Sequence, residues 1–192
     1  MKRIIPIVFV PVLAGCLTST VPSVAEWIVQ TEPQTQKEML SKQPAQTEFG
    51  IARLSLLSVR APYDTRSFQV LRADGTIASD SFNRFAAVPS QLLKGLVLDR
   101  LAKSTQFTTL VASSSSASVD SIVEVTITKL LLDCTNDDSR LAEAELTMMI
   151  LDRERQIVRS SYGRGVADAK NGDYGKAFAD ALKSAIDRAI GD

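Results

Sequence analysis

The stretch that decides the fold class is residues 119–151, VDSIVEVTITKLLLDCTNDDSRLAEAELTMMIL. Residues 119–132 alternate apolar with polar side chains, and residues 141–151 do the same. This period of two is typical of strands that have one face covered. Between them, Asn136-Asp137-Asp138 lies in a polar segment that predicts a turn. The pattern therefore predicts two long strands in an antiparallel sheet.

Three clustered polar or acidic residues in that turn also suggest calcium. The chain lacks the D-x-[DN]-x-[DN]-G-x₅-E pattern of a calcium loop, so we expect a solvated turn instead. Downstream, residues 156–168 predict a further strand, in which Val158, Tyr162 and Val166 share a face.

Upstream of the decisive stretch the same reasoning predicts shorter strands. Residues 51–60 form one candidate, and residues 67–71 and 76–79 flank Asp74-Gly75, a strong hairpin pair. Residues 107–111 predict a short strand, and the serine-rich residues 113–118 predict a loop.

Two segments change to the helical period. Residues 89–103 begin with Pro89, which suits a first helical position, and carry one apolar face. The last helix has a longer stripe, preceded by Asn171 or Asp173 as a cap and followed by Gly191. The stripe consists of Ala177, Phe178, Ala181, Leu182, Ala185, Ile186 and Ala189. The order β-β-β-α-β-β-β-β-α predicts an α+β fold: a mostly antiparallel sheet with two main helices packed on one face, in two layers.

The N-terminus has the features of an export and anchoring signal. Lys2 and Arg3 precede an apolar run of ten residues, shorter than the ~20 that a membrane-spanning helix needs. Leu13-Ala14-Gly15-Cys16 follows and resembles a bacterial lipobox, in which the thiol of Cys16 accepts lipid. An ordinary signal peptide with a chance cysteine is the alternative.

The domain organisation follows from this signal. We expect residues 1–15 to be a lipoprotein signal peptide, residues 16–48 a lipidated N-terminus and linker, and residues 49–192 an α+β domain. Leu17 follows the cysteine where lipoproteins retained at the inner membrane often carry aspartate. The expected location is the periplasmic face of the outer membrane, with a lipid anchor.

Composition excludes several classes of function. The chain has no histidine, which removes Ser-His-Asp and Cys-His catalysis and HExxH zinc sites. Lys+Arg and Asp+Glu are both 22, so no excess positive charge favours nucleic acid. We expect no enzyme activity, no cofactor and no metal.

The second cysteine, Cys134, allows two interpretations. The simpler one is a small, partly buried residue at a strand end. The other is an intermolecular disulfide or a reactive thiol in an oxidising compartment. Nearby Asp133 would raise the pKa of the thiol rather than activate it.

Residues 62–87 combine aromatic and arginine side chains, the types enriched at interface anchors. The candidate interface residues are Tyr63, Arg72, Arg84 and Phe85. In the alternative, Phe68 and Phe85 pack inside the domain and the arginines are merely solvated.

The same region carries motifs in a particular order. Pro62-Tyr63-Asp64, Val70-Leu71-Arg72 and Phe82-Asn83-Arg84-Phe85-Ala86 precede Pro89 and an apolar helix. With the lipobox and the terminal helix, this order resembles the ABC-type transport auxiliary lipoprotein family. The family has tryptophan where this chain has Phe85, and the length before Val70 differs. Trp27-Ile28-Val29 is similar to the strand that commonly follows the lipidated cysteine in the family.

The resemblance implies a function and partners. Lipoproteins of this family are auxiliary components of systems with an MlaE-like permease, an ABC ATPase and a mammalian-cell-entry (MCE) domain protein. Those systems move phospholipids or other hydrophobic molecules between bacterial membranes. The implied role is a docking or conduit component, with the MCE-domain protein and the permease–ATPase complex as partners and with homo-oligomeric rings. The chain has no G-x-x-x-x-G-K-[ST] motif, so a partner must supply the energy.

A second hypothesis comes from the same anchor. A regulatory lipoprotein could activate another envelope machine, such as a peptidoglycan synthase. The long segment 17–48 would give such a regulator reach.

Overall fold

The long alternating stretch forms the centre of the sheet. β6 (Ser121–Asn136) and β7 (Ser139–Leu151) pair antiparallel, and β8 (Ile157–Asp168) continues this arrangement along β7. The strands predicted from the period of two are therefore confirmed. The structure is a computed structural model that describes residues 23–29, 47–111, 113–136, 139–169 and 171–191.

The other side of β6 carries two strands placed end to end. β2 (Ile51–Val59) runs parallel to the first half of β6, and β3 (Ser67–Arg72) runs parallel to its last part. β5 (Thr109–Val111) lies parallel to β2, and β1 (Ala25–Trp27) lies parallel to β4 (Ile77–Phe85). The eight-stranded sheet is thus mixed, although its long ladders, β6–β7 and β7–β8, are antiparallel as predicted.

The hairpin and the helices occur where the sequence predicts them. β3 and β4 pair antiparallel around Asp74-Gly75, and Gly75 has a φ of 80°, which glycine adopts without strain. The first predicted helix consists of α2 (Pro89–Leu92) and α3 (Lys94–Lys103), with Leu93 between them. The last helix is α4 (Tyr174–Ile190), capped by Asp173 and ended by Gly191.

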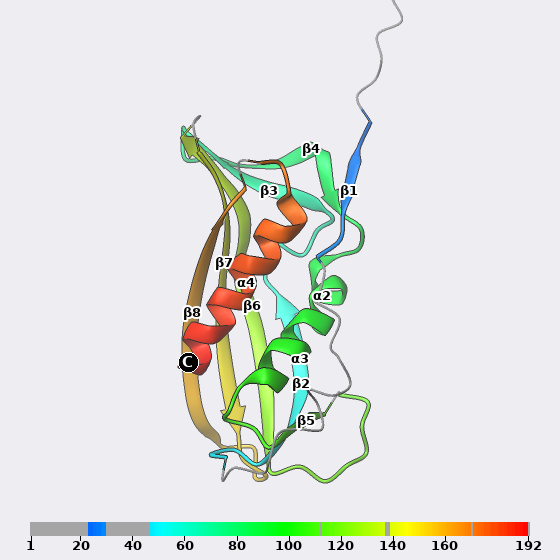
Figure 1. The fold of residues 1–192 in the computed structure, drawn as a ribbon, viewed down its shortest axis with the longest axis vertical. Coiled ribbons are helices and arrows are strands. Elements are labelled where there is room, and N and C mark those ends of the chain that lie inside the picture. Colours follow the sequence, from blue (N-terminus) through cyan, green and yellow to red (C-terminus); the bar gives the residue numbers. More distant parts are fainter. Residues whose placement is uncertain (1–22, 30–46, 112, 137–138, 170, 192) are drawn as a thin grey trace, which may run out of the picture.

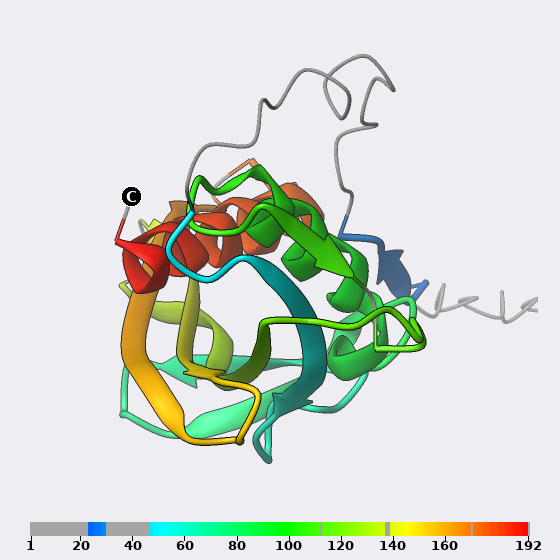
Figure 2. The same cartoon turned by 90° about the horizontal axis from the view of Figure 1, so that it is seen from below.

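The helices form one layer on one face of the sheet. Figure 1 shows α3 and α4 in front of the strands, and Figure 2 shows the sheet curling around that helical layer. The predicted α+β class, with two main helices on one face, is confirmed. The core lies between the layers and includes Phe68, Phe85, Leu96, Leu101, Ile127, Leu146, Phe178 and Leu182.

The close approach of α4 to the sheet depends on small residues. A Cβ atom at Gly163 or Gly165 of β8 would lie 1.8 Å from a carbonyl oxygen of α4. Both glycines are buried, so the helix covers the face of β8 that carries no large side chains.

The simplest interpretation of β8 is that its apolar face is covered, and this packing shows the opposite. Val158, Tyr162 and Val166 do share a face, as predicted, but that apolar face is the exposed one. Their exposed fractions are 53%, 54% and 39%. The covered face is lined by glycine because a helix backbone, rather than side chains, must fit against it.

Candidate interaction surfaces

Arg84, one of the predicted interface residues, forms an ion pair with another residue of the same chain. Its side chain on β4 binds the carboxylate of Glu26 on β1, with Nε at 3.0 Å from Oε1. Arg66 binds the same oxygen at 2.9 Å and also donates from Nε to the Phe85 carbonyl. We call Glu26, Arg66 and Arg84 the Glu26 cluster. It joins β1 to β4 and to the loop before β3.

Trp27 fixes β1 from its inner face. Its Nε1 donates to Asn83 Oδ1 at 3.1 Å, and its ring meets Tyr174 edge-on at 5.3 Å between centroids. The Ile28 carbonyl then passes so close to Gly175 that a Cβ there would lie 2.6 Å from it. Residues 23–29 therefore pack as part of the domain. The predicted domain start at residue 49 leaves this strand out, because a three-residue strand next to a polar segment gives little signal of long-range pairing.

The electrostatics of the Glu26 cluster favour an ionised carboxylate. The hydrogen bond and charge of Arg84, with a smaller contribution from Arg66, hold the pKa of Glu26 below its ordinary value of 4.5. A carboxyl group whose pKa is lowered on folding stabilises the fold above its unfolded pKa, and this contribution is lost as the pH falls through the folded pKa. The attachment of β1 should therefore hold at neutral pH and weaken below pH 4.5.

Changing Glu26 to glutamine is expected to loosen β1 while the rest of the domain stays folded. Trp27 is the only tryptophan, so its fluorescence reports on β1 directly. We expect a red-shifted emission and stronger quenching by acrylamide, with unchanged far-UV circular dichroism, and the same shift for the wild type on acidification below pH 4.5. Exposed ion pairs are individually weak, so the release should be partial.

Glu48→Gln is the matched control for this experiment. Glu48 is another exposed carboxylate, 3.8 Å from Arg159 and far from β1 in the sequence. Its replacement should leave Trp27 emission unchanged. Identical emission in Glu26→Gln and the wild type at neutral pH would show that the cluster does not hold β1.

The other predicted interface residues lie in three different environments. Phe85 is 2% exposed and packs against the tilted rings of Phe68 and Phe178, with ring centroids 4.5 and 5.1 Å away. Its assignment to an interface is therefore wrong, because it belongs to the core. Tyr63 is half-buried against the same core, and Arg72 is exposed at the hairpin end of β3. Cys16 lies outside the described residues.

Cys134 is a half-buried free thiol near the end of β6, which agrees with the simpler of its two readings. Burial raises the pKa of the thiol; Arg140 opposes this rise and Asp133 adds to it. A thiol with a raised pKa is a poor nucleophile at neutral pH.

The outer face of the sheet carries a second surface that sequence reasoning missed. There, Glu143 is almost fully buried and bound to Lys129 at 2.5 Å and to Arg164. Hydrogen bonds from both cations outweigh the cost of burial and lower the pKa of Glu143. Around this charge network stand the exposed Tyr162 and Val166. An exposed aromatic and an arginine side by side are typical of an interface.

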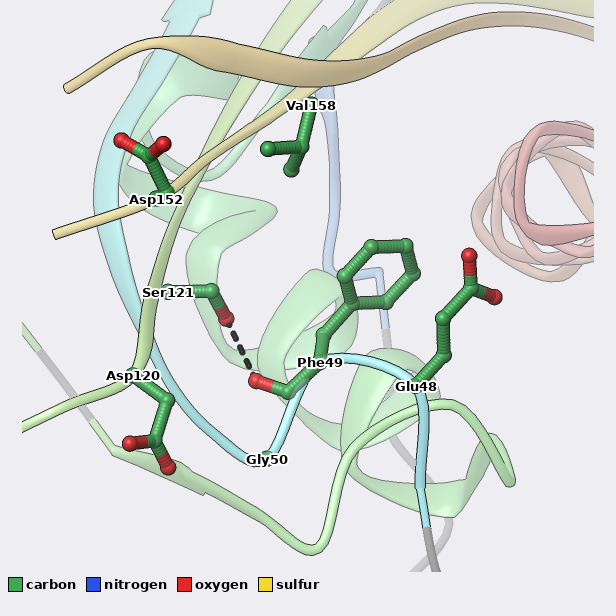
Figure 3. Close-up of a pocket in the computed structure, with 7 residues that line it drawn as sticks. All are labelled: Glu48, Phe49, Gly50, Asp120, Ser121, Asp152 and Val158. Atoms are coloured by element: carbon green, nitrogen blue, oxygen red, sulfur yellow. Dashed lines mark hydrogen bonds between the residues drawn. The ribbon is translucent and has the colours of Figure 1, made fainter. Parts of the chain in front are cut away.

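One hollow lies at the opposite end of the sheet from β1. Its volume is about 520 Å³, and Figure 3 shows Ser121 directed at the Phe49 carbonyl, a hydrogen bond of 2.9 Å. Asp120 on its wall already accepts from the Ile51 amide and from Arg153. Within the described ranges, no three acidic, cysteine or histidine side chains gather as metal ligands would. The Ser121 hydroxyl in its lining donates to a backbone carbonyl rather than to a side-chain base.

Comparison with known proteins adds evidence on the fold. No family model matches the chain, and no curated protein matches it. A solved protein of Xanthomonas campestris, described by the family model DUF330, aligns with a TM-score of 0.62 and 15% identity, over 88% of this chain and 93% of its own. A second structure, described as an uncharacterized protein, aligns with a TM-score of 0.59 and 10% identity, over 88% and 95%. At these identities the likeness shows a shared fold.

Among the described residues, no helix is both long enough and apolar enough to cross a bilayer.

Proposed function

We propose that this protein is an outer-membrane-anchored periplasmic lipoprotein that serves as the docking or conduit component of an ABC/MCE-type transport system. The systems in question move phospholipids or other hydrophobic molecules between bacterial membranes. The observation that carries the proposal is the ordered run of motifs from Pro62 to Pro89 downstream of the lipobox at Cys16.

The roles of the motif residues are consistent with this resemblance. Asp64 accepts the amide of Ser90 at 2.9 Å at the start of α2. Arg84 holds β1, and Phe85 fills the core. Because these residues are engaged inside the domain, partners would bind other surfaces. Binding of an MCE-domain protein and the assembly of rings belong to the proposal.

The alternative of a regulatory lipoprotein loses one of its supports. Its case used the reach of a long tether over residues 17–48. Because β1 packs into the domain, the segment between Cys16 and the domain is shorter than that tether.

The experiment begins with the anchor. Cys16→Ser is expected to block lipid attachment and cleavage by the lipoprotein peptidase, because only a thiol at this position accepts the lipid. Fractionation of the envelope should then find the variant as an unprocessed precursor outside the outer membrane. Normal processing and outer-membrane fractionation of Cys16→Ser would contradict the lipoprotein assignment.

Partner capture completes the experiment. The lipidated wild type is cross-linked in cells, purified from envelope extracts and analysed by mass spectrometry, with Cys16→Ser as the matched control. We expect an MCE-domain protein or its permease to co-purify with the wild type only. Capture of a peptidoglycan synthase, with no MCE component, would favour the regulatory alternative.

A further inference from the structure

The outer face of β1 and β4 carries exposed apolar side chains where the described chain begins. Glu26 pairs with Arg84 in the parallel register. Val24 and Ile28 flank β1, two residues before and after Glu26, and Phe82 is two residues before Arg84. Continuing the printed register by two residues places Val24 beside Phe82, and strand alternation places Ile28 on the side of Glu26. Val24, Phe82 and Ile28 are 45%, 52% and 59% exposed, and we call them the β1 apolar patch.

Charges of both signs stand around the β1 apolar patch. Arg66 and Arg84 stand beside Glu26, and Asp80 accepts the amide of Phe82 at 2.7 Å. Side chains of both charge signs therefore stand beside the apolar side chains. These charges do not favour a partner that carries a single charge sign. The exposed apolar and aromatic side chains instead favour a partner surface into which such groups can insert.

The chain length before the patch restricts what the patch can meet. Eight residue steps separate Val24 from Cys16, so the two lie at most about 28 Å apart even in an extended chain. Without β1 in the domain, the corresponding distance from Cys16 to Phe49 would reach about 115 Å. The attachment of β1 thus keeps one face of the domain close to the anchor.

We propose that the β1 apolar patch is a membrane-contact surface, which touches the bilayer that holds the lipid of Cys16. This inference rests on the proposed lipidation. The aromatic ring of Phe82 sits at the headgroup boundary, while Arg66 and Arg84 extend toward the polar side. Because charges of both signs stand beside the patch, this contact does not require anionic lipid. The domain is held in one orientation on the membrane, with the hollow near Phe49 directed away from it.

The test uses the lipidated chain in vesicles. In a Cys134→Ser background, Phe82→Cys provides the only free thiol once Cys16 carries lipid, and it is labelled with a polarity-sensitive fluorophore. Ile157→Cys is the matched control, because Ile157 is 60% exposed and lies about 30 Å away, at the other end of β6. Both are placed in phosphatidylethanolamine vesicles with and without phosphatidylglycerol, and far-UV circular dichroism verifies that each variant is folded.

We expect the label at residue 82 to shift its emission to the blue and to lose at least half of its intensity to a nitroxide lipid labelled at the headgroup. The label at residue 157 should behave as in water, and phosphatidylglycerol should change neither result. Equal emission and quenching at the two positions in a lipidated sample would overturn the membrane contact. So would shielding of residue 82 that appears only when an envelope protein is added.

The same sample also shows whether lipid is attached to Cys16. The mass of the N-terminal peptide shows whether Cys16 carries lipid. A peptide without lipid would refute the proposed function, and the membrane contact with it. A lipidated peptide with no quenching at residue 82 would refute the membrane contact alone.

Discussion

Replacing Phe178 by alanine is expected to lower the free energy of unfolding by about 3–5 kcal/mol, a large part of the stability of a domain this size. Phe178 lies on α4, is 1% exposed and packs against the rings of Phe68 and Phe85, both 5.1 Å away. Truncation leaves a cavity between two layers that are held apart by neighbouring side chains. Because Phe68 and Phe85 come from different strands, the loss of packing should destabilise the whole sheet.

Thermal and denaturant unfolding of the chain measure this effect. Lys183→Ala on the same helix is the control, since its amino group is 3.9 Å from Asp180 in a surface pair. It should change the stability by less than about 0.5 kcal/mol. A Phe178→Ala variant as stable as Lys183→Ala would mean that the apolar stripe of α4 is a partner surface rather than core.

The sequence predicts this fold best where one strand face is polar and the other apolar. In β6, Val123, Val125 and Ile127 are buried and the side chains between them are partly exposed. The stripe of α4 is buried in the same way. In both cases the period of the apolar residues equals the period of the element, so the pattern alone identifies the covered face.

The rest of the fold depends on pairing between distant segments. β2 and β3 both lie parallel to β6, and β1 lies parallel to β4 across more than fifty residues. The sequence of one strand does not indicate the direction of the strand that pairs with it. Hairpins are predictable because a short turn joins their strands, whereas these parallel ladders are not. The antiparallel parts, joined by short turns, are those that were predicted.

The candidate site shows the same division. The motif around Arg84 and Phe85 could be located in the sequence, but aromatic and arginine residues occur both at interfaces and at places where strands are tied together. The structure assigns Phe85 to the core and Arg84 to the attachment of β1. The outer face with Glu143 and Arg164 was missed because its partners come together only across three strands. Alternating charged residues in a strand were the only available signal.

Replacing Gly165 by alanine is the second large effect that we expect, and it follows from the closest contact between the layers. The added Cβ would lie 1.8 Å from the carbonyl oxygen of Ala181, a backbone atom that cannot rotate away. Either α4 or β8 must move by more than an ångström, so we expect a loss of about 3 kcal/mol or a failure to fold. Gly95→Ala is the matched control: Gly95 lies in α3, and apart from its chain neighbours and its own helix backbone no atom lies within 4 Å of its added Cβ. The same change there should stabilise the chain by about 0.5 kcal/mol. Opposite signs for one substitution at two glycines, measured by denaturant unfolding, would show that β8 carries glycine for the approach of α4; equal and small effects would contradict it.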